Sequence, residues 1–362
     1  MDQVRFGIVG AGRIAQLVAW VFNADPAIAA VAVADVDTEA AGRLAATLGI
    51  SDTYADYRQL LARDDIDAVY IATPPFLHGP MMLDALTAGK HVLCEKPFVL
   101  DVQQAEQVLS AARSTSLRVG CCSCRFHDAP TTRRARELVE TGQLGEIYRL
   151  SFVSVSRPAR PGAAMPAWRN DASKNGGGIA FDWGAYDLDW MAYVLGDRFR
   201  PRRLFGVLGP CFHPTEQRRA PAPDVDGRLA AELLCDDGMI IHWERRAGEH
   251  GPRRHCVELR GTRAGLDLAM TPDGDHGARL VHHAYRGDEE LATTVLPEVP
   301  PEWRGTLVYP LRDFARAILE DRPPASPPER QLTIHAVLQA LYASDQTGES
   351  VVVGGDDTRE PA

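Results

Sequence analysis

The sequence lacks any long uninterrupted run of apolar residues. Nothing in its 362 residues approaches the roughly eighteen uncharged apolar residues of a membrane span, so no transmembrane helix is expected. No basic and apolar leader precedes the first predicted strand, so no secretory signal is expected either. Basic residues are outnumbered by acidic ones, 39 to 49. The net charge of −10 disfavours nucleic acid and anionic membranes as partners.

Cysteines are few and do not form a disulfide pattern. There are seven, an odd number, and three of them lie close together at Cys121, Cys122 and Cys124. This usage predicts a reducing compartment, the cytoplasm. No metal site is expected, because adjacent strand residues point to opposite faces and no second pair of ligands follows at zinc-finger spacing. The three cysteines are expected to be buried as small apolar residues.

Length and pattern predict two domains. At 362 residues the chain is too long for one small domain. In residues 1–124, short apolar runs alternate with helical patterns, which predicts an α/β domain with a doubly wound parallel sheet. Ligands bind at the carboxyl ends of the strands in such a sheet. Four segments fall at these ends, namely residues 10–12, 35, 73–75 and 95–97.

The first strand-to-helix turn carries a dinucleotide-binding pattern, G-x-G-x-x-A. The apolar run Val4–Val9 predicts a buried strand, and helical spacing resumes after the turn. Gly10 permits the tight turn, Gly12 lets a pyrophosphate approach the backbone, and Ala15 allows helix and strand to pack closely. The amides at the start of that helix would face the phosphates. The candidate cofactor contacts in this turn are Gly10, Gly12, Arg13 and Ile14.

An acidic residue follows the second predicted strand. Asp35 lies about twenty residues past the glycines, where its carboxylate would accept hydrogen bonds from an adenine-ribose diol. This context favours dinucleotide binding over the alternative, a turn that needs glycine only for its backbone angles. The next residues, Val36, Asp37 and Thr38, offer no arginine for a 2′-phosphate. NAD is therefore the expected cofactor and NADP the alternative.

The pattern changes after about residue 125. Longer alternating runs predict an α+β domain over residues 125–353 with a large, mostly antiparallel open sheet, followed by a tail at 354–362. Strands are expected over 146–156, 203–208, 229–234, 239–244, 255–260, 266–270, 279–285 and 291–296, and helices over 178–195, 307–320 and 331–345. So few helices would leave one apolar face of the sheet uncovered. This predicts a homodimer or homotetramer formed through the sheet.

Two clusters carry residue types suited to proton transfer. Lys96 follows a predicted strand, where a lysine can hydrogen-bond a substrate hydroxyl and lower the pKa of a neighbouring acid, although a lone lysine there is more often a surface residue. Three glycines at 176–178 precede Asp182, Tyr186 and Asp189, whose spacing predicts one helix face. Triple glycine would let the backbone approach a ligand. The alternative is an ordinary helix start with favourable acidic residues and a core tyrosine.

The motifs of the chain together resemble the Gfo/Idh/MocA family, named for glucose–fructose oxidoreductase, inositol dehydrogenase and rhizopine catabolism proteins. The resemblance runs from about residue 4 to about residue 350. It rests on G-x-G-x-x-A, A-T-P-P-x-x-H (72–78), E-K-P (95–97), the arginine of C-R-F (Arg125), L-G-E-I (144–147) and G-G-G-x-x-x-D-x-G-x-Y-x-x-D (176–189). It implies a Rossmann domain and a C-terminal α/β domain whose sheet forms the substrate wall and usually the oligomer interface.

The resemblance also implies roles for particular residues. Lys96 would be the catalytic lysine, and Asp182 would bind substrate hydroxyls. The residues implied to line the cofactor are Thr73, Pro74, His78, Glu95 and Lys96. The residues implied to lie near the substrate are Arg125, Trp168, Arg169, Asp182 and Tyr186.

One position departs from most of the family. Where most members have histidine, this chain has Tyr186, like the branch that includes glucose–fructose oxidoreductase and sugar or dihydrodiol dehydrogenases. In that branch the phenol exchanges the proton as hydride moves. A phenol with a pKa of about 10 is a poor base at neutral pH unless a cation helps, and Lys96 is the candidate cation.

The expected function is NAD(P)-dependent hydride transfer between nicotinamide and a secondary alcohol, hemiacetal or ketone of a sugar, cyclitol or sugar derivative. Lys96, Tyr186 and Asp182 are the expected catalytic residues. Two alternatives remain: a glycosidase or lyase of this fold that retains NAD with no net redox, and a non-catalytic, sugar-sensing regulator. Intact Lys96 and Tyr186 count against the regulator.

Overall fold

The computed structural model describes residues 2–157, 166–210, 225–271, 279–287, 289–295 and 303–355, which fall into two compact units. The first unit is Met1–Arg125 together with Leu307–Leu332, and the second is Phe126–Thr306 together with Thr333–Ala362. The sequence-based boundary differs from the first division only by Arg125. The segment Leu307–Leu332, expected in the second domain, packs with the first unit instead.

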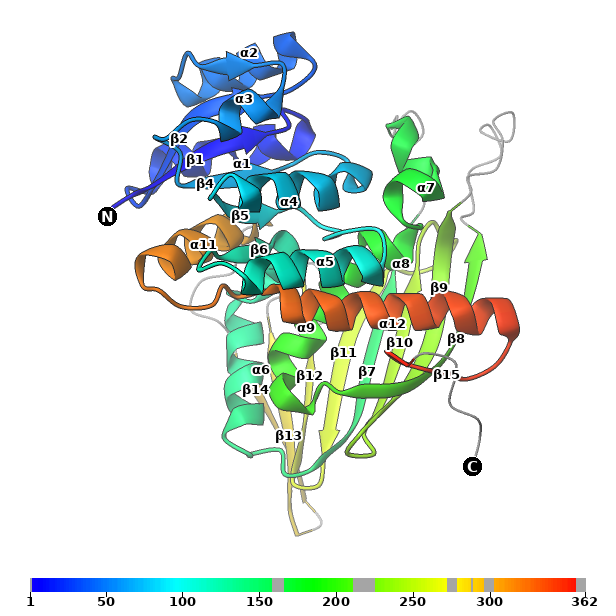
Figure 1. Ribbon diagram of the computed structural model, residues 1–362. Coiled ribbons are helices and arrows are strands. Elements are labelled where there is room, and N and C mark those ends of the chain that lie inside the picture. Colours follow the sequence, from blue (N-terminus) through cyan, green and yellow to red (C-terminus); the bar gives the residue numbers. More distant parts are fainter. Residues whose placement is uncertain are drawn as a thin grey trace. The chain divides into compact units, whose positions relative to one another are not determined.

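Within its described residues, the first unit holds six parallel strands in the order β3-β2-β1-β4-β5-β6 (Figure 1). The strands are β1 (Val4–Val9), β2 (Ile28–Ala34), β3 (Thr53–Tyr54), β4 (Ala68–Ile71), β5 (His91–Cys94) and β6 (Val119–Cys121). The helices are α1 (Arg13–Ala24), α2 (Thr38–Leu48), α3 (Tyr57–Leu61), α4 (His78–Thr87), α5 (Val102–Arg113) and α11 (Tyr309–Leu319). The predicted doubly wound parallel sheet is confirmed, and its strand order reverses between β1 and β4.

Local signals set the helix ends in this unit. α2 begins after Asp37, whose carboxylate accepts hydrogen bonds from the Glu39 and Ala40 amides at 3.1 and 3.0 Å. It ends at Gly49, which adopts a left-handed φ of 73°. α5 likewise begins after a capping aspartate, Asp101.

Helix α11 packs against the sheet of the first unit although it lies near the end of the chain. Phe314 is fully buried, with its ring centroid 6.3 Å from that of Phe6 on β1. Gly120 on β6 leaves room for this ring, since a Cβ there would lie 3.0 Å from it. Arg312 adds an ion pair with Asp25 at 2.6 Å. Hydrophobic periodicity carries no signal for contacts between such distant segments, so it does not assign this helix to the first unit.

The clustered cysteines divide between two apolar cores. Cys121 packs in the core that contains Val9, and Cys122 in the core that contains Phe6, as expected of side chains on opposite sides of a sheet. Burial raises the pKa of the Cys122 thiol well above its usual range. In the part of the chain that the structure describes, no group of three or more His, Cys, Asp or Glu side chains is arranged to hold a metal ion.

The second unit is built on nine strands, counted over its described residues, in the order β14-β13-β12-β11-β7-β10-β9-β8-β15 (Figure 1). They are β7 (Ile147–Val155), β8 (Pro201–Pro210), β9 (Asp226–Cys235), β10 (Ile240–Arg246), β11 (Arg254–Gly261), β12 (Ala264–Leu268), β13 (Leu280–Arg286), β14 (Glu289–Val295) and β15 (Val351–Val352). Neighbours run antiparallel except β7 and β10, which pair in parallel. The prediction of a large, mostly antiparallel sheet is confirmed.

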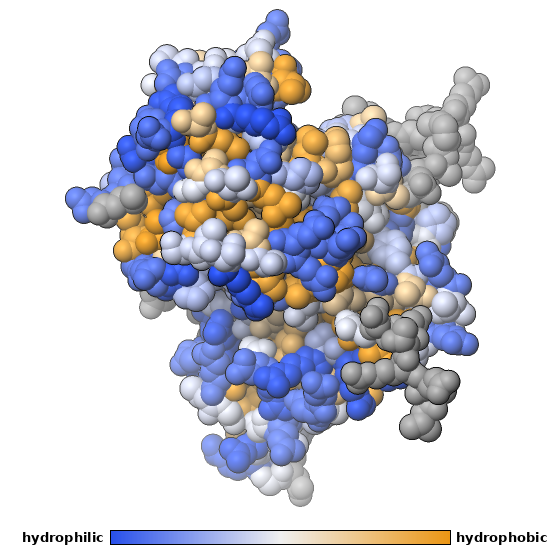
Figure 2. All heavy atoms as spheres, in the orientation of Figure 1, coloured by the Kyte–Doolittle hydropathy of each residue, from blue (hydrophilic) through white to orange (hydrophobic). Residues whose placement is uncertain are grey.

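Helices pack on one face of this sheet. The helices of this part are α6 (Pro130–Glu140), α7 (Ala172–Asn175), α8 (Ile179–Asp182), α9 (Gly184–Leu195), α10 (Trp303–Thr306) and α12 (Pro328–Thr347), whose first residues belong to the first unit. Trp190 of α9 and Leu338 of α12 share one core with Phe152 of β7 and Trp243 of β10. α6 turns Ala135 inward, and hydrophilic residues gather on the surface over it (Figure 2). No helix among the described residues is both long and apolar enough to cross a bilayer.

The other face of the sheet carries charged pairs. His242 of β10 lies 2.7 Å from Glu232 of β9. Asp267 of β12 pairs with Arg260 at 2.6 Å and with His283 at 3.1 Å. The open face is therefore not uniformly apolar, as had been expected, but mixes charged pairs with exposed apolar side chains such as Phe205 and Ile240. Polar side chains alternate outward on strands whose apolar side chains face the helices.

Candidate active site

The turn between β1 and α1 leaves open space beside its second glycine. Gly10 has a φ of 99°, and a Cβ there would lie 2.8 Å from the carbonyl carbon of Ala72, so the fold itself requires this glycine. Gly12 has φ −70° and ψ −172°, and apart from Gly12 and its two chain neighbours no described residue has an atom within 4 Å of where its Cβ would be. Among the described residues no side chain caps α1, and its first turn contains no acidic residue. Such a helix start suits a dinucleotide pyrophosphate.

Asp35, just after β2, braces this turn. Its carboxylate accepts hydrogen bonds from the Ala11 amide at 2.6 Å and from the Asp37 amide at 2.9 Å. No sequence pattern predicted this structural role. Each carboxylate oxygen has two acceptor sites, so the predicted interaction with a ribose diol is compatible with both bonds.

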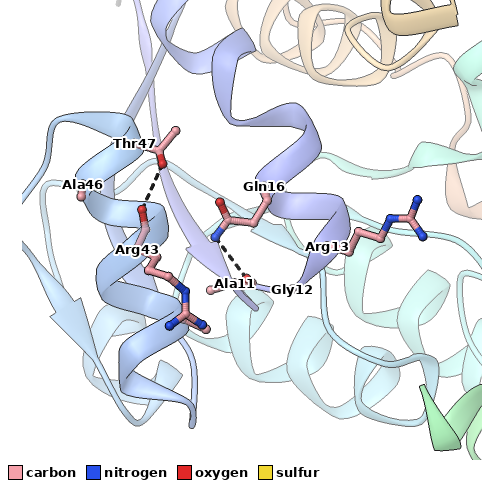
Figure 3. A pocket seen from close by; sticks show the side chains of 8 residues that line it. Ala11, Gly12, Arg13, Gln16, Arg43, Ala46 and Thr47 are labelled. Carbon is pink, nitrogen blue, oxygen red and sulfur yellow. Dashed lines mark hydrogen bonds between the residues drawn. The ribbon is translucent and has the colours of Figure 1, made fainter. Parts of the chain in front are cut away.

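A cavity of about 680 Å³ lies beside the turn, between α1 and α2 (Figure 3). It is lined by Ala11, Gly12, Arg13, Gln16, Ala40, Arg43, Ala46 and Thr47. Figure 3 shows Gln16 and Arg43 extending toward the glycine turn, and Gln16 Nε2 donates to Ala11 O at 3.5 Å. Arg13 extends to the other side of α1, and Ile14 is partly buried against the apolar core. Arg43 is thus a second cation near the turn, which sequence reasoning missed.

A buried histidine ties together the loops after β4 and β5. His78 is fully buried, with Nε2 2.8 Å from the Thr73 carbonyl oxygen and Nδ1 2.8 Å from the Pro97 carbonyl oxygen. Burial lowers the pKa of His78, while the two carbonyls act to raise it. The side chain links the two loops that carry Thr73 and Pro97. Thr73 and Pro74 are partly exposed at the strand end.

A buried charged cluster supports the loop that carries Lys96. Glu95 Oε1 accepts hydrogen bonds from the Tyr70 hydroxyl at 2.7 Å and from Arg125 Nη2 at 2.6 Å. Burial alone would raise the pKa of Glu95, but the Arg125 guanidinium and the Tyr70 hydroxyl hold it below its usual range. The Lys96 amide donates to Glu95 Oε2 at 3.3 Å. Glu95 and Arg125, expected at the cofactor and the substrate, form a buried ion pair with each other.

In the second unit, the single helix predicted over 178–195 is two helices. α8 ends at Asp182, and α9 begins two residues later, with Trp183 at the break. The Tyr186 amide donates to the Trp183 carbonyl, three residues back, at 2.9 Å, which is a tighter turn than the α-helical ladder. Asp182, Tyr186 and Asp189 therefore do not lie on one face of a continuous helix, and the expectation from their spacing is wrong.

Tyr186 lies in the apolar core of the second unit. It is 3% exposed, and its ring meets Phe126 edge-on with 5.4 Å between centroids. The Trp183 ring lies at 5.6 Å. Such packing fixes the ring and leaves the role of the hydroxyl open. Tyr186 is thus a core residue, as the alternative held, and remains the candidate acid/base.

Asp182 is more accessible than Tyr186. Its Oδ2 pairs with Arg169 Nη1 at 3.0 Å, and its side chain is 22% exposed. The guanidinium carbon of Arg169 lies 5.1 Å from the ring centroid of Trp168. Three residues expected near the substrate are therefore brought together in one group.

The three glycines before α8 are enclosed by the protein itself. A Cβ on Gly177 would collide with the Tyr342 hydroxyl, and one on Gly178 with the backbone of Asp226. The Gly178 and Ala180 amides donate to the Asp226 carboxylate at 2.7 and 2.9 Å. The expectation that these glycines let the backbone approach a ligand is wrong, because packing within the unit accounts for them.

Two buried aspartates on α9 have partners that sequence reasoning also missed. Asp187 accepts from Arg245 Nε at 2.7 Å and from Trp243 Nε1 at 2.9 Å, which links α9 to β10. Asp189 is fully buried and lies 3.2 Å from His127 Nε2. The only sequence signal was the occurrence of acidic residues in an otherwise apolar helix, because the partners lie far along the chain.

Comparison with known proteins agrees with the two units. Residues 4–122 match a family model described as an oxidoreductase family with an NAD-binding Rossmann fold. Residues 132–267 match the GFO/IDH/MocA C-terminal domain. The chain belongs to the Gfo/Idh/MocA family. The resemblance inferred from its motifs is confirmed, and this Gfo/Idh/MocA member is an NAD(P)-dependent oxidoreductase whose first unit is the NAD-binding domain.

Relatives of this Gfo/Idh/MocA protein align along most of its length. The uncharacterized oxidoreductase ORF334 of Rhizobium meliloti is 31% identical over 78% of this chain and 79% of its own. The dTDP-3,4-didehydro-2,6-dideoxy-alpha-D-glucose 3-reductase of Streptomyces antibioticus is 30% identical over 88% of this chain and 89% of its own. Among solved structures, levoglucosan dehydrogenase in complex with NADH shares the fold, with a TM-score of 0.86 at 20% identity over 97% of this chain and 99% of its own.

Proposed function

We propose that this chain transfers hydride between NAD(P) and a secondary alcohol, hemiacetal or ketone of a sugar, cyclitol or sugar derivative. The family match supports the redox class, and the name of the Streptomyces relative, a deoxysugar reductase, supports a polyhydroxylated substrate. When bound, the nicotinamide supplies hydride chemistry, while the chain supplies binding and proton transfer.

The observation that carries this proposal is the buried cluster of Tyr70, Glu95 and Arg125 next to Lys96. A buried ion pair adds little to stability compared with apolar packing, so the fold alone does not call for it. The cluster holds the Lys96 backbone through the Glu95 carboxylate. A lysine held at the carboxyl end of a strand in an NAD-binding sheet is suited to polarise a substrate oxygen.

The remaining roles follow from the chemistry of each side chain. Tyr186 is proposed to exchange the proton of the reacting hydroxyl. Lys96 is proposed to polarise its oxygen and to favour the phenolate. Asp182, with Arg169 and Trp168 beside it, is proposed to bind neighbouring hydroxyls. A carboxylate accepts and a guanidinium donates, so together they can hold a diol.

The cofactor is proposed to bind at the open turn of the first unit. The groups proposed to hold it are the backbone of Gly12, Arg13 and Ile14 and the side chains of Asp35, Thr73 and Pro74. Asp35 favours NAD because its carboxylate would repel a 2′-phosphate.

Self-association through the outer face of the sheet is also proposed, as a homodimer or homotetramer. This face mixes apolar side chains with charged pairs. Phe205, Val207 and Ile240 are each nearly half exposed. Interfaces between copies combine an apolar centre with a polar rim, which fits such a mixture. Light scattering at micromolar concentration should give a multiple of the chain mass, and a monomer mass would refute the assembly.

A substrate panel tests the proposed function. Sugars, cyclitols and their keto derivatives are offered with NAD, NADP or the reduced cofactors, and NADH absorbance is followed. Turnover of at least one polyhydroxylated compound is expected, and Lys96→Ala should abolish most of it. Absence of turnover in both directions, with NADH still bound, would refute the proposal.

A further inference from the structure

Asp226 and Tyr342 meet at the start of α8 from two distant parts of the second unit. Asp226 is the first residue of β9, and Tyr342 lies on α12. The Asp226 carboxylate accepts hydrogen bonds from the Gly178 amide at 2.7 Å, from the Ala180 amide at 2.9 Å and from the Tyr342 hydroxyl. Each bond has an ionised acceptor, which makes it stronger than a bond between neutral groups. We call these two side chains the α8 clamp.

The residues around the α8 clamp leave no room for a larger side chain. A Cβ on Gly177 would collide with the Tyr342 hydroxyl, and one on Gly178 with the Asp226 backbone. The Tyr342 ring also packs on Phe181, with 5.7 Å between centroids. Burial and the Asp226 charge raise the pKa of Tyr342, so its hydroxyl keeps the proton that it donates. The first turn of α8 is therefore held by charge, hydrogen bonds and packing together.

Helix α8 is too short to absorb a displacement of its start. It has four residues, of which Asp182 is the last. The Asp182 amide donates to the Gly178 carbonyl at 2.9 Å. One backbone hydrogen bond therefore joins Gly178, which the α8 clamp holds, to Asp182. The Asp182 carboxylate in turn pairs with Arg169 at 3.0 Å. A shift at the glycines is therefore transmitted to Asp182.

We propose that Asp226 and Tyr342 are positioning residues for substrate binding, which hold the Asp182 carboxylate where it receives substrate hydroxyls. This inference rests on the proposed function and adds residues that act through Asp182. Supporting residues of this kind set how accurately a binding group is held.

Three variants test the α8 clamp in steady-state kinetics on the substrate found with the panel. Asp226→Ala should raise the substrate KM by about tenfold or more, equivalent to ~1.4 kcal/mol, and leave the KM for NAD unchanged. Tyr342→Phe should raise it by a smaller factor, since one of three hydrogen bonds is lost. The substrate KM of Asp226→Asn should lie between those of the other two variants. The amide oxygen of the new asparagine still accepts a hydrogen bond, whereas its amide nitrogen cannot accept one from the Ala180 amide.

Two matched controls in the first unit remove comparable hydrogen bonds. Asp101→Ala removes an aspartate that accepts from the Gln104 amide at 2.8 Å at the start of α5. Tyr57→Phe removes a hydroxyl that donates to Asp84 at 2.5 Å. Both controls should keep the wild-type substrate KM. These two variants show how the loss of a helix cap or of a tyrosine–aspartate hydrogen bond affects the substrate KM when no proposed substrate-binding residue depends on that bond.

Hydrogen exchange gives a readout independent of activity. Peptides covering 176–186 should exchange faster in Asp226→Ala and Tyr342→Phe, because the Gly178 and Ala180 amides lose a held acceptor. If the wild type turns over nothing on the panel, the proposed function fails, and exchange still decides whether the clamp orders α8. With an active wild type, an unchanged substrate KM in the variants overturns the inference, whether or not exchange is faster. Should Asp226→Ala fail to fold, Asp226→Asn and Tyr342→Phe decide by the same criteria.

Discussion

Two glycine-rich turns start helices in this chain, one in each unit, and they differ in what surrounds them. At the start of α1, no described residue other than Gly12 and its chain neighbours has an atom within 4 Å of a Cβ built on Gly12, and no described side chain caps the helix. At the start of α8, a Cβ on Gly178 would collide with the Asp226 backbone, and the Asp226 carboxylate binds two amides. The first turn is open, and the second is filled by protein.

The difference assigns different roles to the two turns. An open glycine at a helix start presents its backbone to an anion, so around Gly12 the backbone is itself the proposed binding group. A filled glycine lets two chain segments approach each other. In the second unit, the groups proposed to act on the substrate are therefore two side chains that follow the glycines, those of Asp182 and Tyr186. A glycine in a motif is best interpreted by what its missing Cβ would touch.

The largest effect is expected at the side chains beyond the filled turn. Tyr186→Phe keeps the ring packed on Phe126 and removes only the hydroxyl, so kcat should fall by roughly 10²–10⁴ while NAD binding is unchanged. Lys96→Ala should cost a similar factor and the double variant little more, because the pair acts as a unit. Single-turnover kinetics measures the chemical step. If Tyr186→Phe keeps more than about half of the wild-type rate, Tyr186 is a packing residue and Asp182 is the next candidate.

A large effect on stability is expected at the charged cluster of the first unit. Glu95→Gln removes the carboxylate that pairs with the buried Arg125 guanidinium, and breaking a buried ion pair costs about 3–5 kcal/mol. Although burial acts to raise the pKa of Glu95, Arg125 lowers it below the ordinary value of 4.5. The stabilisation that ionised Glu95 contributes is therefore complete above pH 4.5. It is lost as the pH falls through the lower pKa that Glu95 has in the folded protein.

Urea unfolding from neutral pH to about pH 3 measures this dependence. The wild type should lose stability in acid, and Glu95→Gln should lack that part of the loss. Glu106→Gln, at an exposed position of α5, is the control and should behave as the wild type. Identical pH profiles for the wild type and Glu95→Gln would contradict a buried, ionised Glu95.

Sequence patterns sufficed where the determining contacts are local. A capping aspartate and a terminal glycine set the ends of α2. Short apolar runs marked the strands of the first sheet, and alternation of polar and apolar residues marked those of the second. The family motifs also identified the NAD-binding domain, which the family model over residues 4–122 confirms.

The remaining features depend on pairs that are distant in the sequence. Asp226 binds the Gly178 amide across 48 positions, and Arg125 binds Glu95 across 30. A periodic pattern contains no information about such pairs, so the sequence suggested a ligand-facing turn at 176–178 and did not predict the pairing of Arg125 with Glu95. The packing of α11 with the first unit could not be predicted for the same reason.

A smaller effect is expected for cofactor choice at the open turn. Asp35→Ser combined with Val36→Arg removes the carboxylate and adds a cation at an exposed position, and should shift the preference toward NADP by about tenfold or more. The ratio of kcat/KM with NADP and with NAD measures the shift. If the wild type already prefers NADP tenfold, the role proposed for Asp35 is wrong. Arg13 and Arg43, which line the cavity, would then be the candidates for binding the phosphate.

The difference between the two turns is tested most directly by a matched pair of substitutions, Gly12→Ala and Gly178→Ala. Both positions are helix N-caps, so a loss of up to about 1 kcal/mol from a poorer cap is common to both. NADH fluorescence titration and calorimetry are applied to each variant. Gly12→Ala should weaken NADH binding by about tenfold or more and unfold near the wild-type temperature. Gly178→Ala should bind NADH as the wild type does and unfold several degrees lower, because overpacking costs about 1–3 kcal/mol. Wild-type NADH affinity in Gly12→Ala, or a wild-type unfolding temperature in Gly178→Ala, would contradict the assignment of an open and a filled turn.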